Sequence, residues 1–110
     1  MKRIFVLAIL LLACLPVAAH ADDKTEASIK LFQFQPKTIE VKVGTTVEWV
    51  NGDDIEHSVT AGAPGKETKD FDSGFFKREG RFAFTFTKPG SYSYFCKRHP
   101  SMKATVVVTE

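Results

Sequence analysis

Hydrophobic and polar side chains alternate along much of the chain after residue 28. This spacing places alternate side chains of an extended strand on one face, against a core. The runs that show it most clearly are residues 29–31, 39–43, 47–49 and 82–86. Residues that favour turns close the runs, for example at 51–54 and 88–90. The pattern predicts short antiparallel strands, and no segment has a helical period.

Two further strands are expected near the end of the chain, at residues 91–96 and 104–109. Residues 62–70 are rich in Gly, Pro and charge, and we expect them to form a surface loop. The chain therefore offers about seven strands in one domain of about 90 residues. An all-β, two-sheet sandwich is the architecture that suits this size and spacing.

The first 21 residues have the features of a secretory signal peptide. Lys2 and Arg3 precede an apolar run at 4–12 that is too short to span a bilayer, and small residues surround Ala21. We expect cleavage after Ala21, which leaves residues 22–110 as the mature domain, without a membrane span.

The two cysteines of the chain have different expected fates. Residues 11–14 leave open a second interpretation of the leader, in which Cys14 is lipidated and kept as an anchor. Loss of Cys14 with the signal peptide leaves Cys96 alone, so no internal disulfide can form. A single thiol in an oxidising compartment is prone to oxidation, and either burial or a metal ion would protect it.

The charge of the chain argues against one class of partner. The full chain has 15 Lys and Arg residues and 13 Asp and Glu residues. Removal of Lys2 and Arg3 leaves the mature domain with a net charge of about zero. Binding to nucleic acid therefore has no electrostatic support.

Cys96, His99 and Met102 place three metal-binding side chains in one loop between two predicted strands. The mature domain has one further histidine, His57, which follows the turn at 51–54. Taken singly, each residue is more often structural. Together they are every Cys, His and Met of the mature domain, and thiolate and thioether donors with two imidazoles select copper. Two His and one Cys with a weak axial Met form the arrangement of blue copper electron-transfer sites.

With these residues the sequence resembles the cupredoxin family, and in particular its plastocyanin, amicyanin and pseudoazurin branch. The resemblance covers nearly all of residues 27–108. The ligand loop, with two residues between Cys and His and two between His and Met, is similar to that of amicyanin. The motifs that carry the resemblance are Phe34-x-Pro36-x-x-Ile39-x-Val41-x-x-Gly44, Val47-x-Trp49-x-Asn51-x-Asp53, His57, Phe71-Asp72-Ser73-Gly74, Phe84-x-Phe86 and Gly90-x-Tyr92-x-Tyr94-x-Cys96-x-x-His99-x-x-Met102.

The resemblance implies a Greek-key sandwich of seven to eight strands, with one copper ion held under the loops at one end. It implies that Cys96 supplies the thiolate and His57 the buried imidazole. His99 would be the imidazole that reaches the surface, and Met102 the weak axial ligand. The protein would cycle between Cu(I) and Cu(II) as a periplasmic electron carrier, without enzymatic activity.

The implied partners are redox proteins, such as a c-type cytochrome or a periplasmic dehydrogenase or reductase. They would dock transiently at the His99 surface of a monomer. Lys97, Arg98 and Lys103 flank the site. They form either a basic rim that attracts an acidic partner or an ordinary solvated loop, and the sequence leaves both interpretations open.

Two positions depart from the family pattern. Ser58 stands where an asparagine commonly links the two ligand loops, and a serine reaches less far. Arg98 stands where many relatives have proline, and we expect its backbone N–H to donate to the Cys96 sulfur.

Two other function classes use similar ligands. A copper-trafficking protein could use the same four residues, but the sequence has no Met- or His-rich tract for transfer of the metal. A hydrolytic zinc site could use two His and one Cys, but it needs an open fourth position and a general base. The sequence favours the electron carrier.

Overall fold

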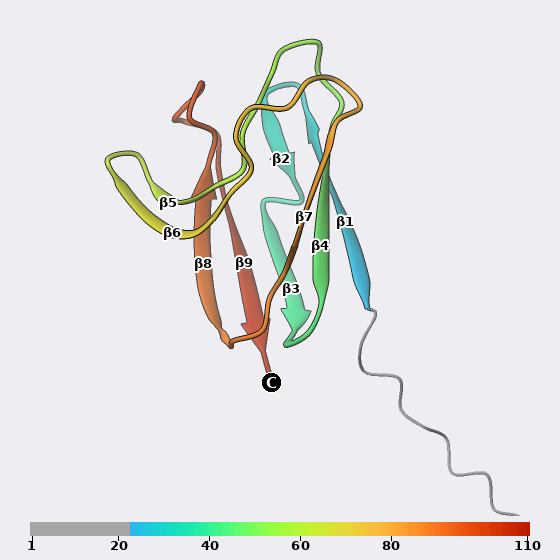
Figure 1. The fold of residues 1–110 in the computed structure, drawn as a ribbon, viewed down its shortest axis with the longest axis vertical. Helices are drawn as coiled ribbons and strands as arrows, with labels where there is room; N and C mark the ends of the chain where they lie inside the picture. Colours follow the sequence, from blue (N-terminus) through green and yellow to red (C-terminus); the bar gives the residue numbers. More distant parts are fainter. Residues whose placement is uncertain (1–22) are drawn as a thin grey trace, which may run out of the picture.

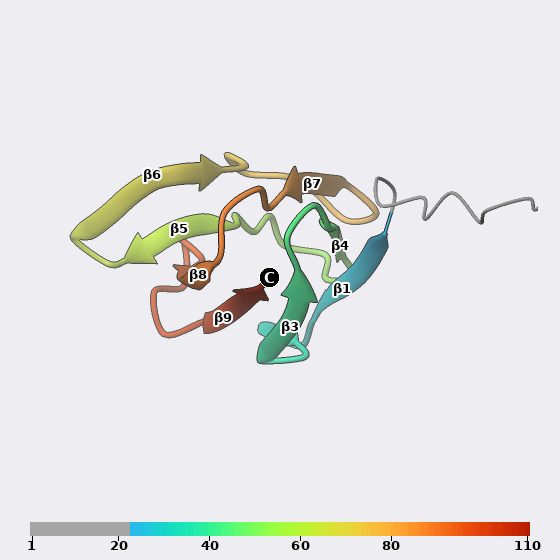
Figure 2. The same ribbon diagram turned by 90° about the horizontal axis from the view of Figure 1, so that it is seen from below.

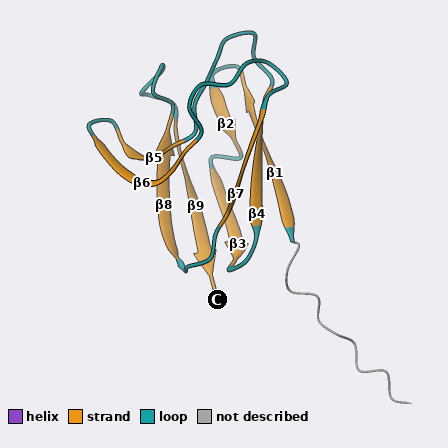
Figure 3. Cartoon of the chain, in the orientation of Figure 1, coloured by secondary structure: helices purple, strands orange, loops and turns teal. Residues whose placement is uncertain are grey.

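The computed structural model describes residues 23–110 and contains nine strands and no helix within that range (Figures 1 and 3). The expected signal peptide, its cleavage point and Cys14 lie outside the described residues. Within the described part of the chain, no helix is long and apolar enough to cross a membrane. The strands are β1 (Lys24–Lys30), β2 (Gln33–Gln35), β3 (Thr38–Lys42), β4 (Thr46–Asn51), β5 (Thr60–Ala63), β6 (Lys66–Asp72), β7 (Arg81–Thr85), β8 (Gly90–Phe95) and β9 (Lys103–Thr109).

The strands form two layers around one core, as the view from below shows (Figure 2). One sheet has the strand order β2-β1-β4-β7, and the other has the order β3-β9-β8-β5-β6. The pairs β1–β4 and β3–β9 are parallel, whereas the remaining pairs are antiparallel. The predicted all-β, two-sheet sandwich is confirmed, with nine strands in place of the expected seven to eight.

Residues 33–42 contribute one strand to each sheet. β2 returns antiparallel to β1, with Phe34 opposite Ile29, whereas β3 lies parallel to β9. Pro36 stands between β2 and β3, and it has no N–H to donate to a neighbouring strand. One alternating stretch therefore supplies a strand to each sheet, which raises the strand count above the expected number.

The predicted surface loop at residues 62–70 is wrong, because most of it belongs to the hairpin of β5 and β6. Pro64 and Gly65 form the turn between these strands. Every residue of β6 except Phe71 is exposed, so the segment lacks the alternation by which a strand is recognised. Backbone pairing with β5, rather than burial of side chains, forms this strand.

Aromatic side chains fill the space between the sheets around Trp49 of β4. The indole ring stacks with Phe71 and Phe82 at centroid distances of 6.1 and 5.8 Å. Its Nε1–H donates to the hydroxyl of Tyr94 in β8, across the sandwich, at 3.2 Å. Burial raises the pKa of Tyr94 to about 12. Phe82 and Phe84 of β7 pack against this core, and the hydrogen bond from Trp49 to Tyr94 joins the two layers.

Gly62 is the position at which the hairpin of β5 and β6 is least tolerant of a side chain. Its φ is 106°, and a β-carbon there would lie 2.8 Å from the Glu67 Cα and 2.9 Å from the Thr68 N. Gly65 also has a positive φ, of 75°, but a β-carbon there meets nothing within 4 Å.

We therefore expect Gly62→Ala to lower the free energy of unfolding by about 2–3 kcal/mol, through backbone strain and overlap together. Gly65→Ala is the matched control and should cost only about 1 kcal/mol. Urea unfolding of both variants measures the difference. Equal losses would show that the close approach at Gly62 is not a constraint on the fold.

Candidate metal centre

Three of the four predicted ligands come together from the segments that follow β4 and β8, at the end of the sandwich that is uppermost in Figure 1. The ligand atoms of His57, Cys96 and His99 all lie within 4.8 Å of one another. His57 and Cys96 are fully buried, and the Cys96 Sγ lies 3.6 Å from the His57 Nδ1. The fold therefore brings together two side chains that are 39 residues apart in the chain.

Different elements place the two buried residues. Cys96 directly follows the end of β8. His57 lies between β4 and β5, where two backbone hydrogen bonds, of 3.2 and 2.9 Å, pair it with Phe76. Both the N–H and the C=O of His57 are used in this bridge, so its main chain is held in place independently of its side chain.

The short loop from Cys96 to Met102 is closed by its own backbone. The Met102 N–H donates to the His99 carbonyl at 2.8 Å, and the Cys96 N–H donates to the Met102 carbonyl at 3.1 Å. Met102 is buried, with 5% of its surface exposed. The fourth predicted ligand is therefore buried and bonded through its main chain to both Cys96 and His99, directly before β9.

The imidazole of His57 has a different neighbour at each nitrogen. Its Nδ1 faces the Cys96 sulfur, and its Nε2 lies 2.9 Å from a carboxylate oxygen of Asp53. Asp53 also accepts hydrogen bonds from the backbone N–H groups of Leu31 and Phe32, at 2.8 and 2.9 Å. Burial of Asp53 opposes ionisation, but the hydrogen bonds from Phe32, His57 and Leu31 outweigh it and lower the pKa of this carboxyl. In the sequence, Asp53 belongs to the turn at 51–54 and to the motif that begins at Val47, but neither predicts that it contacts His57.

A ring of hydrogen bonds joins the two ligand-bearing segments. The Ser58 Oγ accepts the backbone N–H of Lys97 at 2.9 Å and lies 2.9 Å from the Thr60 hydroxyl. The Thr60 hydroxyl donates to Asp72 at 3.2 Å, and the Lys97 ammonium returns to the other oxygen of Asp72. Ser58 therefore links the loops, as expected from its position. Thr60 and Asp72 continue the hydrogen-bonded chain beyond the short serine side chain and return it to Lys97.

The prediction that the backbone N–H of Arg98 donates to the Cys96 sulfur is wrong. In the part of the chain that the structure describes, the N–H group that donates to the Cys96 Sγ is that of Ser58, at 3.4 Å. Ser58 directly follows His57, whose bridge to Phe76 fixes the main chain there, whereas Arg98 is exposed in the loop after Cys96. The fixed segment, rather than the exposed loop, supplies the donor.

One atom in the cluster indicates that a ligand belongs there. The His99 Nδ1 is buried and has no hydrogen-bond partner among residues 23–110. Buried polar atoms are nearly always paired, so a lone nitrogen beside a second imidazole and a thiol calls for a bound group. Two nitrogens and a sulfur fit copper, which accepts imidazole and soft thiolate ligands.

Phe32 completes the surroundings of the two imidazoles. Its ring is edge-on to His57 and His99, with centroid distances of 5.5 and 4.9 Å, and 44% of the residue is exposed. It therefore lies between solvent and the histidine pair. Its apolar character alone did not distinguish it in the sequence from the other phenylalanines.

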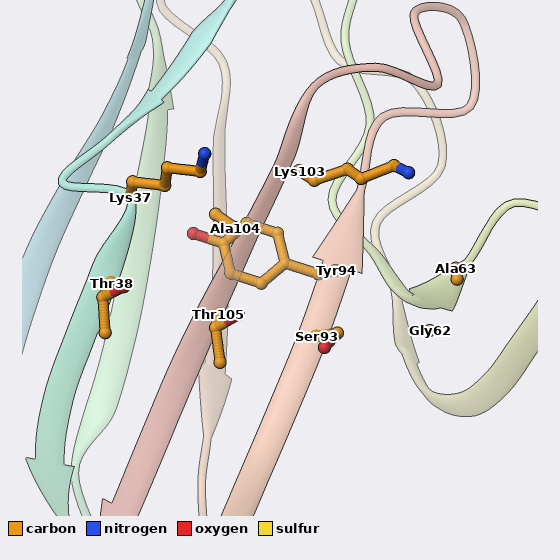
Figure 4. Close-up of a pocket in the computed structure, with 9 residues that line it drawn as sticks. All are labelled: Lys37, Thr38, Gly62, Ala63, Ser93, Tyr94, Lys103, Ala104 and Thr105. Carbon is orange, nitrogen blue, oxygen red and sulfur yellow. The ribbon is translucent and has the colours of Figure 1, made fainter.

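Two surface hollows of residues 23–110 lie apart from the three clustered side chains. One, of about 280 Å³, lies over β8 and β9, between Lys37 and Lys103 (Figure 4). A second, also of about 280 Å³, borders Phe32 and Met102. Neither is lined by His57, Cys96 or His99, so neither provides a substrate cleft at these three side chains.

Comparison with known proteins places the chain in a family. Residues 21–109 match the family model described as copper binding proteins, plastocyanin/azurin family. Amicyanin from Paracoccus versutus is 36% identical over 98 residues, which cover 84% of this chain and 72% of the relative. Amicyanin-alpha from Methylorubrum extorquens is 35% identical over 85 residues, covering 76% and 71%. A solved structure of an amicyanin variant in its reduced Cu(I) form has a TM-score of 0.71 and 32% identity, covering 81% of this chain and 85% of the other. The chain therefore belongs to the plastocyanin/azurin family of copper-binding proteins.

Proposed function

We propose that this protein is a blue copper electron carrier whose single ion is held by His57, Cys96, His99 and Met102. The observation that carries the proposal is the convergence of three ligand atoms within 4.8 Å, with Met102 buried at the end of the loop that carries two of them. Copper, when bound, supplies a one-electron change between Cu(I) and Cu(II). The donor set of two imidazoles, a thiolate and a thioether suits both oxidation states.

The four residues have different roles in this proposal. Cys96, buried and provided with the Ser58 N–H, supplies the thiolate responsible for the colour. His57 supplies Nδ1 from the fully buried side of the site. His99 is half-buried, next to the exposed Pro100, and gives electrons a path to the surface. Met102 is the weak axial ligand that helps to set the reduction potential.

The surroundings of the ligands suit electron transfer because they restrict movement. The hydrogen-bond ring through Ser58 fixes one ligand segment to the other. The backbone bonds of the Cys96–Met102 loop fix the second segment internally. A site that moves little on oxidation has a low reorganisation cost, and this property serves a carrier rather than a protein that releases its metal. Neither hollow is lined by His57, Cys96 or His99, so the two hollows give a hydrolytic zinc enzyme no cleft at these three side chains.

The carrier acts in the periplasm, after export and cleavage of residues 1–21, and residues 22–110 form the mature cupredoxin domain. The basic and apolar start of the sequence and the small residues around Ala21 support this proposal. Lipidation at Cys14 is the alternative, and it would tether the same domain to a membrane.

Docking of a redox protein at the His99 surface completes the proposal, with a c-type cytochrome, a dehydrogenase or a reductase as the partner of a monomer. Exposed apolar side chains of Leu31, Phe32 and Ile55 lie on the loops at this end. The Lys97 ammonium is paired with Asp72, which leaves Arg98 as the exposed cation between the two ligands Cys96 and His99.

Addition of one equivalent of Cu(II) to the exported protein should give an intense blue colour, since a thiolate is among the ligands. Cys96→Ser should abolish the colour, and the matched control Cys14→Ser should leave it unchanged. Voltammetry should then show a reversible one-electron wave. Copper uptake without reversible cycling would favour trafficking, and a wild-type protein that stays colourless would contradict the copper site. The mass of the exported chain identifies its first residue.

Ser58→Ala should lower the free energy of unfolding by about 1–3 kcal/mol, because the Lys97 N–H loses its acceptor. The colour of the copper protein should persist, since the backbone N–H of residue 58 still donates to the sulfur. Ser93→Ala, at an exposed position in β8, is the control and should change stability by less than about 0.5 kcal/mol. Urea unfolding and visible spectra separate the two effects; loss of colour with unchanged stability would contradict the role given to the Ser58 hydroxyl.

Oxidation of the reduced protein by the anion hexacyanoferrate(III) should slow as ionic strength rises, if positive charge surrounds the exit at His99. Arg98→Ala should reduce the rate about two- to threefold at low salt. Lys88→Ala removes an equal charge from the turn between β7 and β8, which lies at the opposite end of the sandwich (Figure 1), and should have no effect. If both variants behave alike, the loop is an ordinary solvated surface.

A further inference from the structure

The geometry points to Asp53 as the positioning residue of the copper site: one carboxylate fixes the orientation of His57 and holds the turn that places Phe32 over both imidazoles. The inference rests on the copper site proposed above and extends it to a residue that binds no metal.

The carboxylate of Asp53 is itself held in place. The backbone N–H of Asp53 donates to the side-chain oxygen of Asn51 at 2.9 Å. Asn51 is fully buried, and its amide nitrogen donates to the carbonyls of Ile55 and Phe76, at 2.9 and 3.0 Å. Asp53 therefore projects from a turn that Asn51 closes onto Ile55 and ties to Phe76, the partner of His57 in the backbone bridge.

An ionised carboxylate only accepts hydrogen bonds, so the Nε2 of His57, at 2.9 Å from it, must carry the hydrogen. The other nitrogen, Nδ1, then has a free lone pair and faces the Cys96 sulfur at 3.6 Å. The main chain of His57 is already fixed by Phe76, and rotation of the ring is the freedom that remains. Asp53 removes this freedom and selects the tautomer that can bind a metal.

The same carboxylate holds an unfavourable backbone conformation. Leu31 and Phe32 have φ values of 52° and 59°, in the left-handed region that bulky residues rarely adopt. Both of their N–H groups donate to Asp53, one to each oxygen. The two charge-assisted hydrogen bonds offset the cost of this turn. As a result the Phe32 ring lies edge-on to His57 and His99.

Two consequences follow for the loaded protein. A negative charge hydrogen-bonded to a ligand imidazole makes that ligand more basic and favours Cu(II) over Cu(I), so it lowers the reduction potential. The Phe32 ring covers both imidazoles on the solvent side, so it slows the escape of copper. Loss of Asp53 should therefore change the potential and the rate of metal loss together, whereas loss of the ring alone should change mainly the rate.

The test compares the copper-loaded full protein with Asp53→Asn and with the matched control Asp54→Asn. Asp54 is the next residue, its side chain is 82% exposed, and it pairs with Arg78 away from the ligands. Asp53→Asn should raise the reduction potential, alter the visible spectrum and speed copper loss to a chelator about tenfold or more. Asp54→Asn removes the same charge and should do none of these. Asp53→Glu should restore part of the wild-type behaviour. If Asp53→Asn and Asp54→Asn behave alike, the inference is overturned.

A further variant separates the two roles of the carboxylate. Phe32→Leu keeps an apolar side chain but removes the aromatic edge, and it should speed copper loss with little change in potential. A copper-loss rate equal to that of the wild type would overturn the covering role of the ring.

A measurement on the wild type does not depend on the folding of any variant. Nitrogen-15 NMR of the metal-free protein should show hydrogen on the Nε2 of His57 and none on its Nδ1. The reverse tautomer would overturn the inference even if copper binds. Conversely, a wild-type protein with the expected tautomer but no colour with copper would contradict the proposed function and leave the role of Asp53 in orienting His57 intact.

Discussion

The hydrogen bond from Trp49 to Tyr94 is the interaction on which the candidate site depends. It crosses the core between β4 and β8, which belong to different sheets. Tyr94 stands two residues before Cys96, and the chain beyond β4 leads to His57. The separation of the two layers, set by the large aromatic side chains around this bond, therefore sets the separation of sulfur and imidazole. A packed core of this kind does not deform gradually, so it keeps that separation constant.

Two independent sets of hydrogen bonds surround the cluster, one on each side of His57. Asp53 and Asn51 hold the ring and the turn in front of it. Ser58 and its neighbours hold the loop that carries Cys96. Hydrogen bonds in a buried network strengthen one another when every polar group has a partner, whereas an unpaired polar group in such a network lowers stability. The lone unpaired nitrogen of His99 stands out against this background, within the described residues, as the place where the protein alone is incomplete.

The sandwich and the four candidate ligands could be predicted from the sequence, because alternation and residue type report them directly. The sequence did not predict the hairpin of β5 and β6, since exposed strands have no alternation to detect. Nor did it predict the roles of Asp53 and Phe32, which depend on a left-handed turn that brings Phe32 against distant histidines. The sequence predicted Arg98, and not Ser58, as the hydrogen-bond donor to the Cys96 sulfur, because spacing along the chain does not show which N–H points inward.

β9 follows all other strands in the chain, yet it lies inside its sheet, between β3 and β8. Its pairing with β8 closes the loop that carries Cys96 and His99. During synthesis, therefore, the full set of four side chains cannot be assembled until β9 has emerged and docked against β8. A chain without β9 would display the thiol of Cys96 with no strand to hold the histidine and methionine of the same loop in place.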